Sequence, residues 1–238
     1  ASYMATIDNV LASSDGLEKT GAGTLVLTGD NTFSGGTTIS DGVLSVSSDG
    51  NLGDTGSGVT FDGGALQFGA SFDLAVSRSM TLEAGGGVID TNGYDTYVGQ
   101  TISGEGSLAK TGSGALTLGG SNTYTGQTTI EAGGVLALSG SGGIASSSGV
   151  VADGAFDISV ADSDRQITAL SGGGSVVLGG NDLDIANASG TFSGVISGDG
   201  GVDIDGGVQI LTGANSFAGD LGIADGAPAR SGHGGTPG

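Results

Sequence analysis

One stretch of this sequence occurs twice, and this repetition limits the possible folds more than any other feature. The first copy, LEKTGAGTLVLTGDNTFSGGTTISDGVLSV, spans Leu17–Val46, and the second, LAKTGSGALTLGGSNTYTGQTTIEAGGVLAL, spans Leu108–Leu138. Matching residues are 91 positions apart until one residue is inserted after Gly133. A shorter third copy spans Gly206–Gly226. Repetition at a long period is typical of solenoids, in which each unit packs on its neighbours.

Apolar and polar residues alternate within each copy, as in Thr24–Thr28. A period of two predicts a strand that is buried on one face. Turn residues follow in both copies, at 29–31 and 120–122, and then a short β-branched segment, Thr-Thr-Ile. We find no glycine-free window with helical spacing of apolar residues. The pattern predicts an all-β chain that winds from strand to turn to strand.

The copies resemble the passenger-associated repeat of type V autotransporters, whose consensus reads roughly L-x-K-x-G-x-G-x-L-x-L-x-G-x-N-x-[YF]-x-G-x-T-x-[IV]. Both long copies match nearly every fixed position, and the third keeps Leu211, Gly213, Asn215, Phe217 and Gly219. The resemblance implies a right-handed, single-stranded parallel β-helix, pertactin-like, at the cell surface or outer membrane of a Gram-negative bacterium, or secreted. It brings no catalytic residues and no cofactor. It also implies an excised fragment of a precursor with a C-terminal outer-membrane barrel.

The spacing of the copies leads to a specific prediction for the coils. We expect about four coils of roughly 23 residues between copies and about ten coils in all. Asn31, Asn122 and Asn215 should then mark the same corner of different coils, where an amide and a nearby aromatic ring support a turn. The predicted inward-facing residues are Leu25, Leu27, Leu44, Val46, Phe61, Leu66, Phe68, Leu116, Leu118, Leu136, Leu138, Ile158, Val160 and Ile185.

Three regions are expected along the chain. Residues 1–16 lack the repeat and form an N-terminal edge or a cloning-derived segment, residues 17–226 form the β-helix, and residues 227–238 form a flexible tail. Segments 47–107 and 139–195 are less regular than the repeats. Binding residues are often found in irregular segments, and we expect any contact surface there.

Charge and composition exclude several classes of protein. The chain carries 25 acidic and 5 basic residues, a net charge of −20, which opposes binding to nucleic acid. Cysteine is absent, which excludes disulfides and thiolate metal sites. No apolar stretch approaches the roughly 18 residues of a membrane-spanning helix.

Two short motifs resemble those of proteases. Asp54–Ser57 reads Asp-Thr-Gly-Ser, the aspartic-protease tetrapeptide, but that chemistry needs a second carboxylate and no partner copy occurs. A Ser-His-Asp triad would need His233, the single histidine, which lies in the expected tail. Neither motif supports a protease.

Four aspartates are weak candidates for a calcium site. They lie in two segments that resemble, imperfectly, the calcium β-roll repeat, and stacking of the coils would bring Asp184 near Asp205. The other two candidates are Asp182 and Asp203. A calcium-binding module of the β-roll kind therefore remains an alternative.

The main functional hypothesis is a non-enzymatic adhesin or structural stalk. Its partner would be a host-cell surface, matrix or glycan, and the fragment would be a monomer. A polysaccharide-acting β-helix enzyme is the other alternative. In that case Arg78 and Arg165, which lie outside the repeats, would mark a binding loop.

Overall fold

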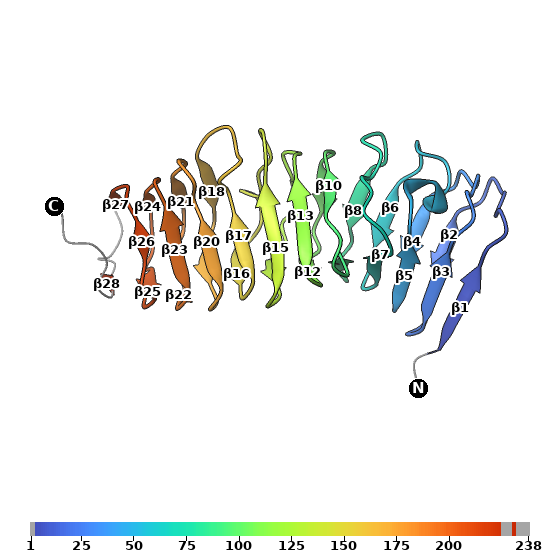
Figure 1. The fold of residues 1–238 in the computed structure, drawn as a ribbon, viewed down its shortest axis with the longest axis horizontal. Helices are drawn as coiled ribbons and strands as arrows, with labels where there is room; N and C mark the ends of the chain where they lie inside the picture. Colours follow the sequence, from blue (N-terminus) through green and yellow to red (C-terminus); the bar gives the residue numbers. More distant parts are fainter. Residues whose placement is uncertain (1–2, 225–229, 232–238) are drawn as a thin grey trace.

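The protein is an elongated parallel β-solenoid of about eleven turns, with β1 at one end and β27 at the other (Figure 1). This computed structural model describes residues 3–224 and 230–231. All strand pairs in the described residues are parallel, and each strand inside a sheet pairs with strands one coil before and one coil after it. No α-helix occurs in the described residues, which confirms the all-β prediction. None of the helical structure there could cross a membrane.

Each turn of the solenoid has three faces. The first face is a nine-stranded sheet, continued through the Gly172–Phe192 bridge by a three-stranded sheet. The nine-stranded sheet contains β1 (Met4–Ile7), β3 (Thr24–Leu27), β5 (Val43–Val46), β7 (Ala65–Phe68), β9 (Gly87–Asp90), β12 (Leu108–Thr111), β14 (Thr128–Ile130), β16 (Val150–Ala152) and β19 (Leu170–Ser171). The three-stranded sheet contains β22 (Thr191–Phe192), β25 (Ile210–Leu211) and β28 (Arg230–Ser231).

The second face is a seven-stranded sheet. It contains β10 (Thr96–Val98), β13 (Gly114–Leu118), β15 (Gly134–Leu138), β17 (Ala155–Asp157), β20 (Ser175–Val177), β23 (Val195–Gly198) and β26 (Ser216–Phe217). Nearer the N-terminus, irregular segments and one turn of 3-10 helix, η1 (Asp49–Leu52), take the place of strands on this face.

The third face consists of a five-stranded and a four-stranded sheet. The first contains β2 (Leu17–Lys19), β4 (Thr37–Ile39), β6 (Val59–Phe61), β8 (Met80–Leu82) and β11 (Ile102–Gly104). The second contains β18 (Arg165–Ile167), β21 (Leu183–Ile185), β24 (Val202–Ile204) and β27 (Leu221–Ile223). Irregular coils continue the face between the two sheets, through the Ser121–Gly143 bridge.

The coils are shorter than the spacing of the copies suggested. Met4 pairs with Thr24, and Thr24 with Val43, so these coils take 20 and 19 residues. Other coils are longer, since Ala65 pairs with Val88 23 residues later. The prediction of about ten coils is close to the roughly eleven turns of the structure. Short turns join the strands, and many coils do not contain a longer connecting segment.

The prediction that the copies lie on matching faces fails for the two long copies. The first copy starts on the third face with β2 and continues on the first face with β3, whereas the second starts on the first face with β12 and continues on the second with β13. The 91-residue offset is thus four coils plus one further face. Asn122 follows a strand of the second face, while Asn31 and Asn215 follow strands of the first, so the prediction of one shared corner is wrong for Asn122.

Inward-facing side chains from all three faces form one continuous core. Of the predicted inward residues, twelve are fully buried, and Leu25 is half-buried against the core. Val160 is the exception, with 61% of its surface exposed. The Ser159 N–H donates to Oδ1 of Asp157, and the resulting turn takes the chain off the sheet before Val160.

The ends of the chain differ in part from the expected regions. Residues 4–7, inside the predicted N-terminal edge segment, form the first strand of the nine-stranded sheet. In the predicted tail, Arg230 and Ser231 form β28, which pairs with β25, while the rest of residues 227–238, His233 included, lies outside the described residues.

Candidate functional site

The asparagine of each copy joins neighbouring coils. Oδ1 of Asn31 accepts a hydrogen bond from the Leu11 N–H at 2.8 Å, and its Nδ2 donates to the Asn51 carbonyl at 2.6 Å. These partners lie 20 residues before and 20 residues after it. Asn122 accepts from the Ile102 N–H in the preceding coil and donates to the Gly143 carbonyl in the following one. The predicted structural role of these amides is confirmed.

The aromatic residue of the second copy is also structural. Tyr124 is buried, and its hydroxyl shares a 2.6 Å hydrogen bond with Thr128, which in turn contacts Ser147 at 2.9 Å. Burial raises the pKa of Tyr124, so the phenol stays protonated and hydrogen-bonded at neutral pH.

The lysine of each long copy binds turn carbonyls. Nζ of Lys110 donates to the Thr111 and Gly112 carbonyls and to the Thr91 hydroxyl at 2.7–2.8 Å. Its side chain is fully buried, and burial lowers the pKa of Lys110 to about 8, although Asp90 and Asp95 act in the opposite direction. The ammonium group is therefore part of the coil framework and not a surface charge.

Arg78 is buried as well, although the enzyme hypothesis assigned it to a binding loop. Its guanidinium forms a salt bridge with Asp49, in which Nε lies 2.9 Å from Oδ1. The remaining donors bind the carbonyls of Asp49, Leu52, Gly53, Asp54 and Ser57 at 3.0–3.2 Å. Arg78 thus stabilises the irregular part of the second face and leaves no donor directed at a ligand.

Arg165 has a comparable role in a second irregular region. Its guanidinium donates to the Gly140 carbonyl, to the Ser163 hydroxyl and to the carboxylate of Asp162, at 2.9 Å for the last. It holds the loop before β18, which projects from the solenoid (Figure 1). The prediction that Arg78 and Arg165 mark a binding loop is wrong, because both side chains are nearly or fully buried in structural contacts.

A surface hollow of about 350 Å³, lined by residues that include Tyr3, Glu18 and Lys19, contains a single carboxylate. Two smaller hollows contain none. One, of about 160 Å³, is lined by glycines and small residues such as Val88 and Ala109, and another, of about 190 Å³, by residues such as Gln127 and Ser148. Neither lining contains a carboxylate, whereas glycoside hydrolysis requires a pair of them. In the tetrapeptide at Asp54, the carboxylate accepts the Gly56 N–H and stabilises a turn.

The four candidate calcium ligands lie on the third face. Asp184 pairs in register with Asp203 on the next coil, because this coil takes 19 residues. Asp203, and not the expected Asp205, is therefore the residue opposite Asp184. Oδ1 of Asp182 accepts the Gly201 N–H. The described residues contain no group of three or more acidic or histidine side chains suited to a metal ion. Calcium binding therefore stays a prediction.

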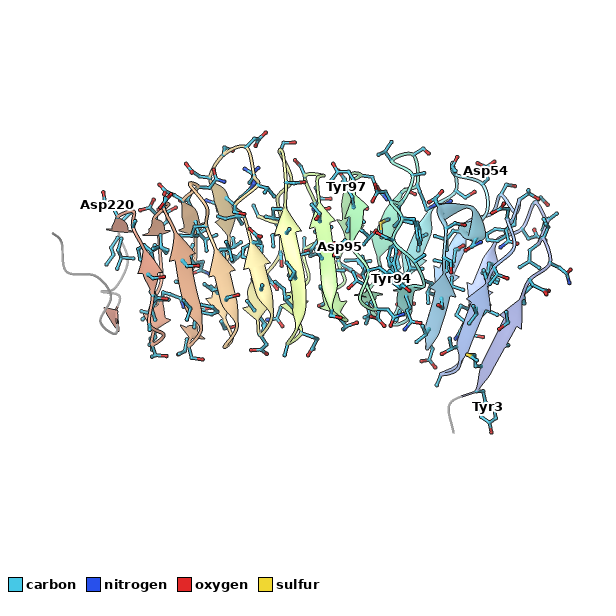
Figure 2. The ribbon with its side chains drawn as sticks, in the orientation of Figure 1. Tyr3, Asp54, Tyr94, Asp95, Tyr97 and Asp220 are labelled. Atoms are coloured by element: carbon cyan, nitrogen blue, oxygen red, sulfur yellow. The ribbon has the colours of Figure 1, made fainter. Side chains whose placement is uncertain are left out.

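The exposed aromatic side chains were missed by the sequence reasoning. Tyr94 and Tyr97 are 39% and 40% exposed, and Val76, 72% exposed, lies near Tyr97 across Gly99. We call these three residues the tyrosine platform. Asp95 lies between Tyr94 and Tyr97 in the chain, and Figure 2 shows these three residues in the same part of the solenoid. A tyrosine at an outward position of an alternating strand could have indicated the tyrosine platform from the sequence. Only the structure shows that Val76 lies near Tyr97.

Comparison with known proteins finds a family model that matches the three repeats. The model of the passenger-associated transport repeat matches residues 17–46, 108–141 and 202–227. The chain therefore contains passenger-associated transport repeats and resembles an autotransporter passenger domain. Over 104 residues, 44% of its length, the passenger is 44% identical to a protein named "Adhesin BmaC autotransporter" from Brucella suis biovar 1 (strain 1330). It spans 3% of that relative's length. No solved structure matches it.

The similarity to autotransporters supports a location at the cell surface or outer membrane of a Gram-negative bacterium, or outside the cell after secretion. The matched repeats contain the structural lysines and asparagines, whereas the tyrosine platform lies between the first two matches. Shared repeat chemistry therefore builds the coils, and the sequence between the repeats provides the exposed groups.

The acidic third face leads to a pH-dependent prediction for the passenger. Partial burial, and then the charge of Asp203, raise the pKa of Asp184 above its ordinary value. The native state thus binds more protons than the unfolded state just above pH 3.8, so this group's contribution to stability falls as the pH rises through that window. Asp184→Asn should increase the free energy of unfolding by up to about 1 kcal/mol at pH 7 and leave it unchanged near pH 3.

Urea unfolding at the two pH values measures this effect, and Asp8→Asn, at the other end of the solenoid, is the control. If the Asp184→Asn variant were less stable than the wild type at pH 7, the Asp184 carboxylate would instead make a favourable contact.

Proposed function

We propose that this passenger segment is a non-enzymatic, adhesin-type contact element whose solenoid holds the tyrosine platform away from the bacterial surface. The relative that it resembles over 104 residues is named an adhesin. A structural stalk would need only the coils. A stalk that also makes contact needs an exposed surface of a kind that partners bind.

The distribution of charged and polar groups supports a scaffold and not an enzyme. Arg78, Arg165 and Lys110 are used in hydrogen bonds that hold the irregular segments and turns. A catalytic site needs titratable groups that converge on a cleft. Two of the hollows described above contain only neutral side chains, and the third contains a single carboxylate, Glu18.

The observation that carries the proposal is the tyrosine platform. Tyrosine side chains are enriched at protein interfaces because they offer a large apolar area with a polar tip. Two of them, each about 40% exposed, lie within four residues in a chain whose aromatic content is only 5%. The proposed partner class is a host-cell surface or matrix component.

The segment that carries the platform is suited to point substitution. Residues 47–107 contain strands of all three faces, from β6 to β11, so deletion would remove core coils together with the contact surface. Substitution of exposed side chains changes the surface and leaves the coils in place.

The test is attachment of beads coated with the purified chain to host cells. Tyr94→Ala with Tyr97→Ala should reduce the number of attached beads about ten-fold, the loss expected for one interface hot spot. Tyr3→Ala, which removes a tyrosine that is 81% exposed at the end of the solenoid, is the matched control and should attach normally.

Thermal melting of each variant shows that the coils remain folded. Undiminished attachment of the folded double variant would place the contact surface elsewhere. Cleavage of a host polysaccharide by the wild-type chain would favour the enzyme alternative.

A further inference from the structure

We propose that the tyrosine platform and its flanking carboxylates bind a lysine or arginine side chain of a protein partner. This inference rests on the proposed function, because it assigns a chemical class of partner to the same surface. Four observations carry it: the position of the Tyr97 ring, the two carboxylates beside it, the absence of a free cation nearby among the described residues, and the charge of the whole chain.

The ring of Tyr97 lies across the backbone of the neighbouring coil. A methyl group built on Gly119 would come within 2.6 Å of Cζ of Tyr97, and one built on Gly99 within 2.8 Å of its Cε1. The ring therefore occupies the space that side chains at these two positions would fill. The distal end of the ring is held against these glycines, and 40% of the residue stays open to a partner. Such an ordered aromatic side chain loses little conformational entropy on binding.

Two carboxylates are fixed next to this ring by backbone donors. Oδ1 of Asp73 accepts a hydrogen bond from the Tyr97 N–H at 3.0 Å. Oδ1 of Asp95, two residues before Tyr97, accepts from the Ala115 N–H at 2.8 Å. Both aspartates are exposed, and within the part of the chain that the structure describes, neither Oδ2 atom has a hydrogen-bond partner. Each carboxylate therefore keeps an acceptor oxygen for a ligand.

Arg78, two residues after Val76, is fully buried in its salt bridge with Asp49. Lys110, the basic residue that acts on Asp95, is also engaged elsewhere. Lys110 interacts electrostatically with Asp95, but it is fully buried and its Nζ binds carbonyl and hydroxyl oxygens inside the coil. It has no exposed surface with which to neutralise the outside of the platform. The remaining nearby acidic residue, Asp90, already accepts hydrogen bonds from Gln67 and from the Asn92 N–H.

An exposed aromatic face beside acceptor carboxylates matches the chemistry of a cationic side chain. An ammonium or guanidinium group over a tyrosine ring is attracted to the negative ring face, and arginine makes this contact more often than lysine. Carboxylates bind the same group by charge-assisted hydrogen bonds. A chain with a net charge of −20 also attracts a basic partner over a long range and repels an anionic one. These features favour a basic protein segment over an anionic glycan.

The test uses isothermal titration of the purified chain with an acetylated peptide of two arginines separated by glycines. The matched probe replaces both arginines with citrulline, which keeps the shape of the side chain and removes its charge. We expect the arginine peptide to bind, with an affinity that falls as salt is added. The citrulline peptide should bind at least about five-fold more weakly, or about 1 kcal/mol.

Protein variants locate the site. Tyr97→Ala and Asp73→Asn should each weaken the arginine peptide about five-fold, since each removes one contact with the cation. Tyr97→Phe keeps the ring and should bind like the wild type. Tyr3→Ala and Asp220→Asn, which change the same residue types far from the platform, should also leave binding unchanged (Figure 2).

The outcomes separate this inference from the proposed function. Equal binding of the arginine and citrulline peptides overturns the inference, and so does wild-type binding by Tyr97→Ala. Binding of a neutral oligosaccharide such as lactose that is lost in Tyr97→Ala, without binding of the arginine peptide, would replace the basic partner with a glycan. If the platform variants lose cell attachment while the arginine peptide does not bind, the proposed function stands and the inference fails.

Discussion

Leu116→Asp is expected to destabilise the solenoid by about 4 kcal/mol or more. Leu116 is fully buried, and it lies in the stack between Thr96 and Leu136 of the neighbouring coils. The substitution removes apolar contacts and puts a carboxylate where no donor is available to bind it. Urea unfolding, followed by circular dichroism, measures the loss.

The adjacent residue is the matched control. Thr117 lies on the same strand, β13, but its side chain points away from the core and is partly exposed. Thr117→Asp should cost less than about 1 kcal/mol, since a surface charge keeps its water. Equal losses in the two variants would contradict the register of β13.

Arg78→Met is expected to cost about 3–5 kcal/mol, the range for breaking a buried salt bridge by removing one partner. The Asp49 carboxylate would lose its counter-ion, and the Leu52, Gly53 and Ser57 carbonyls would lose their donor. Urea unfolding again measures the effect. Protease cleavage near η1 should also become faster, because the guanidinium holds this irregular segment in place.

Arg78→Lys separates charge from hydrogen bonding. Lysine keeps the positive charge but lacks the planar fork that binds several acceptors at once. Its loss of stability should lie between wild type and Arg78→Met. An Arg78→Lys variant as stable as the wild type would show that the charge alone matters, and that the carbonyl contacts contribute little.

The architecture could be predicted from the sequence because its signals are local. The alternation at Thr24–Leu27 and again at Gly114–Leu118 defines which residues face inward, and the structure places both segments in parallel sheets. The roles of Asn31 and Asn122 also follow from local chemistry, since an amide at a turn needs backbone partners. Short-range patterns thus predict the coil.

The winding of the coil could not be obtained in the same way. The distance between copies is a multiple of the coil length only if the copies lie on the same face. Val26 reaches Thr111 after four coils, through Ser45, Gln67 and Asp90. The residue of the second copy that matches Val26 is Thr117, on the next face. Coil length depends on how each turn closes, which the repeat does not encode.

The exposed and buried polar residues between the repeats were the hardest to assign. Arg78 looked free in the sequence because its partners lie 21 to 29 residues earlier in the chain. Tyr97 looked like an ordinary strand residue, since the glycine beneath it, Gly119, belongs to the next coil. Both assignments depend on contacts between coils. Such contacts have no local signature.

The direction of the ladder hydrogen bonds has a mechanical consequence. They link one coil to the next, and the amide of Asn122 extends this linkage to the coils on both sides. A pulling force on the chain at one end of the stack therefore acts on the terminal coil alone and detaches it before the next. Each detached coil of about 20 residues frees roughly 65 Å of chain, whereas a folded coil adds only about 4.8 Å to the stack. A tether of this kind lengthens under load in small steps, and the coils that stay folded keep their surface intact.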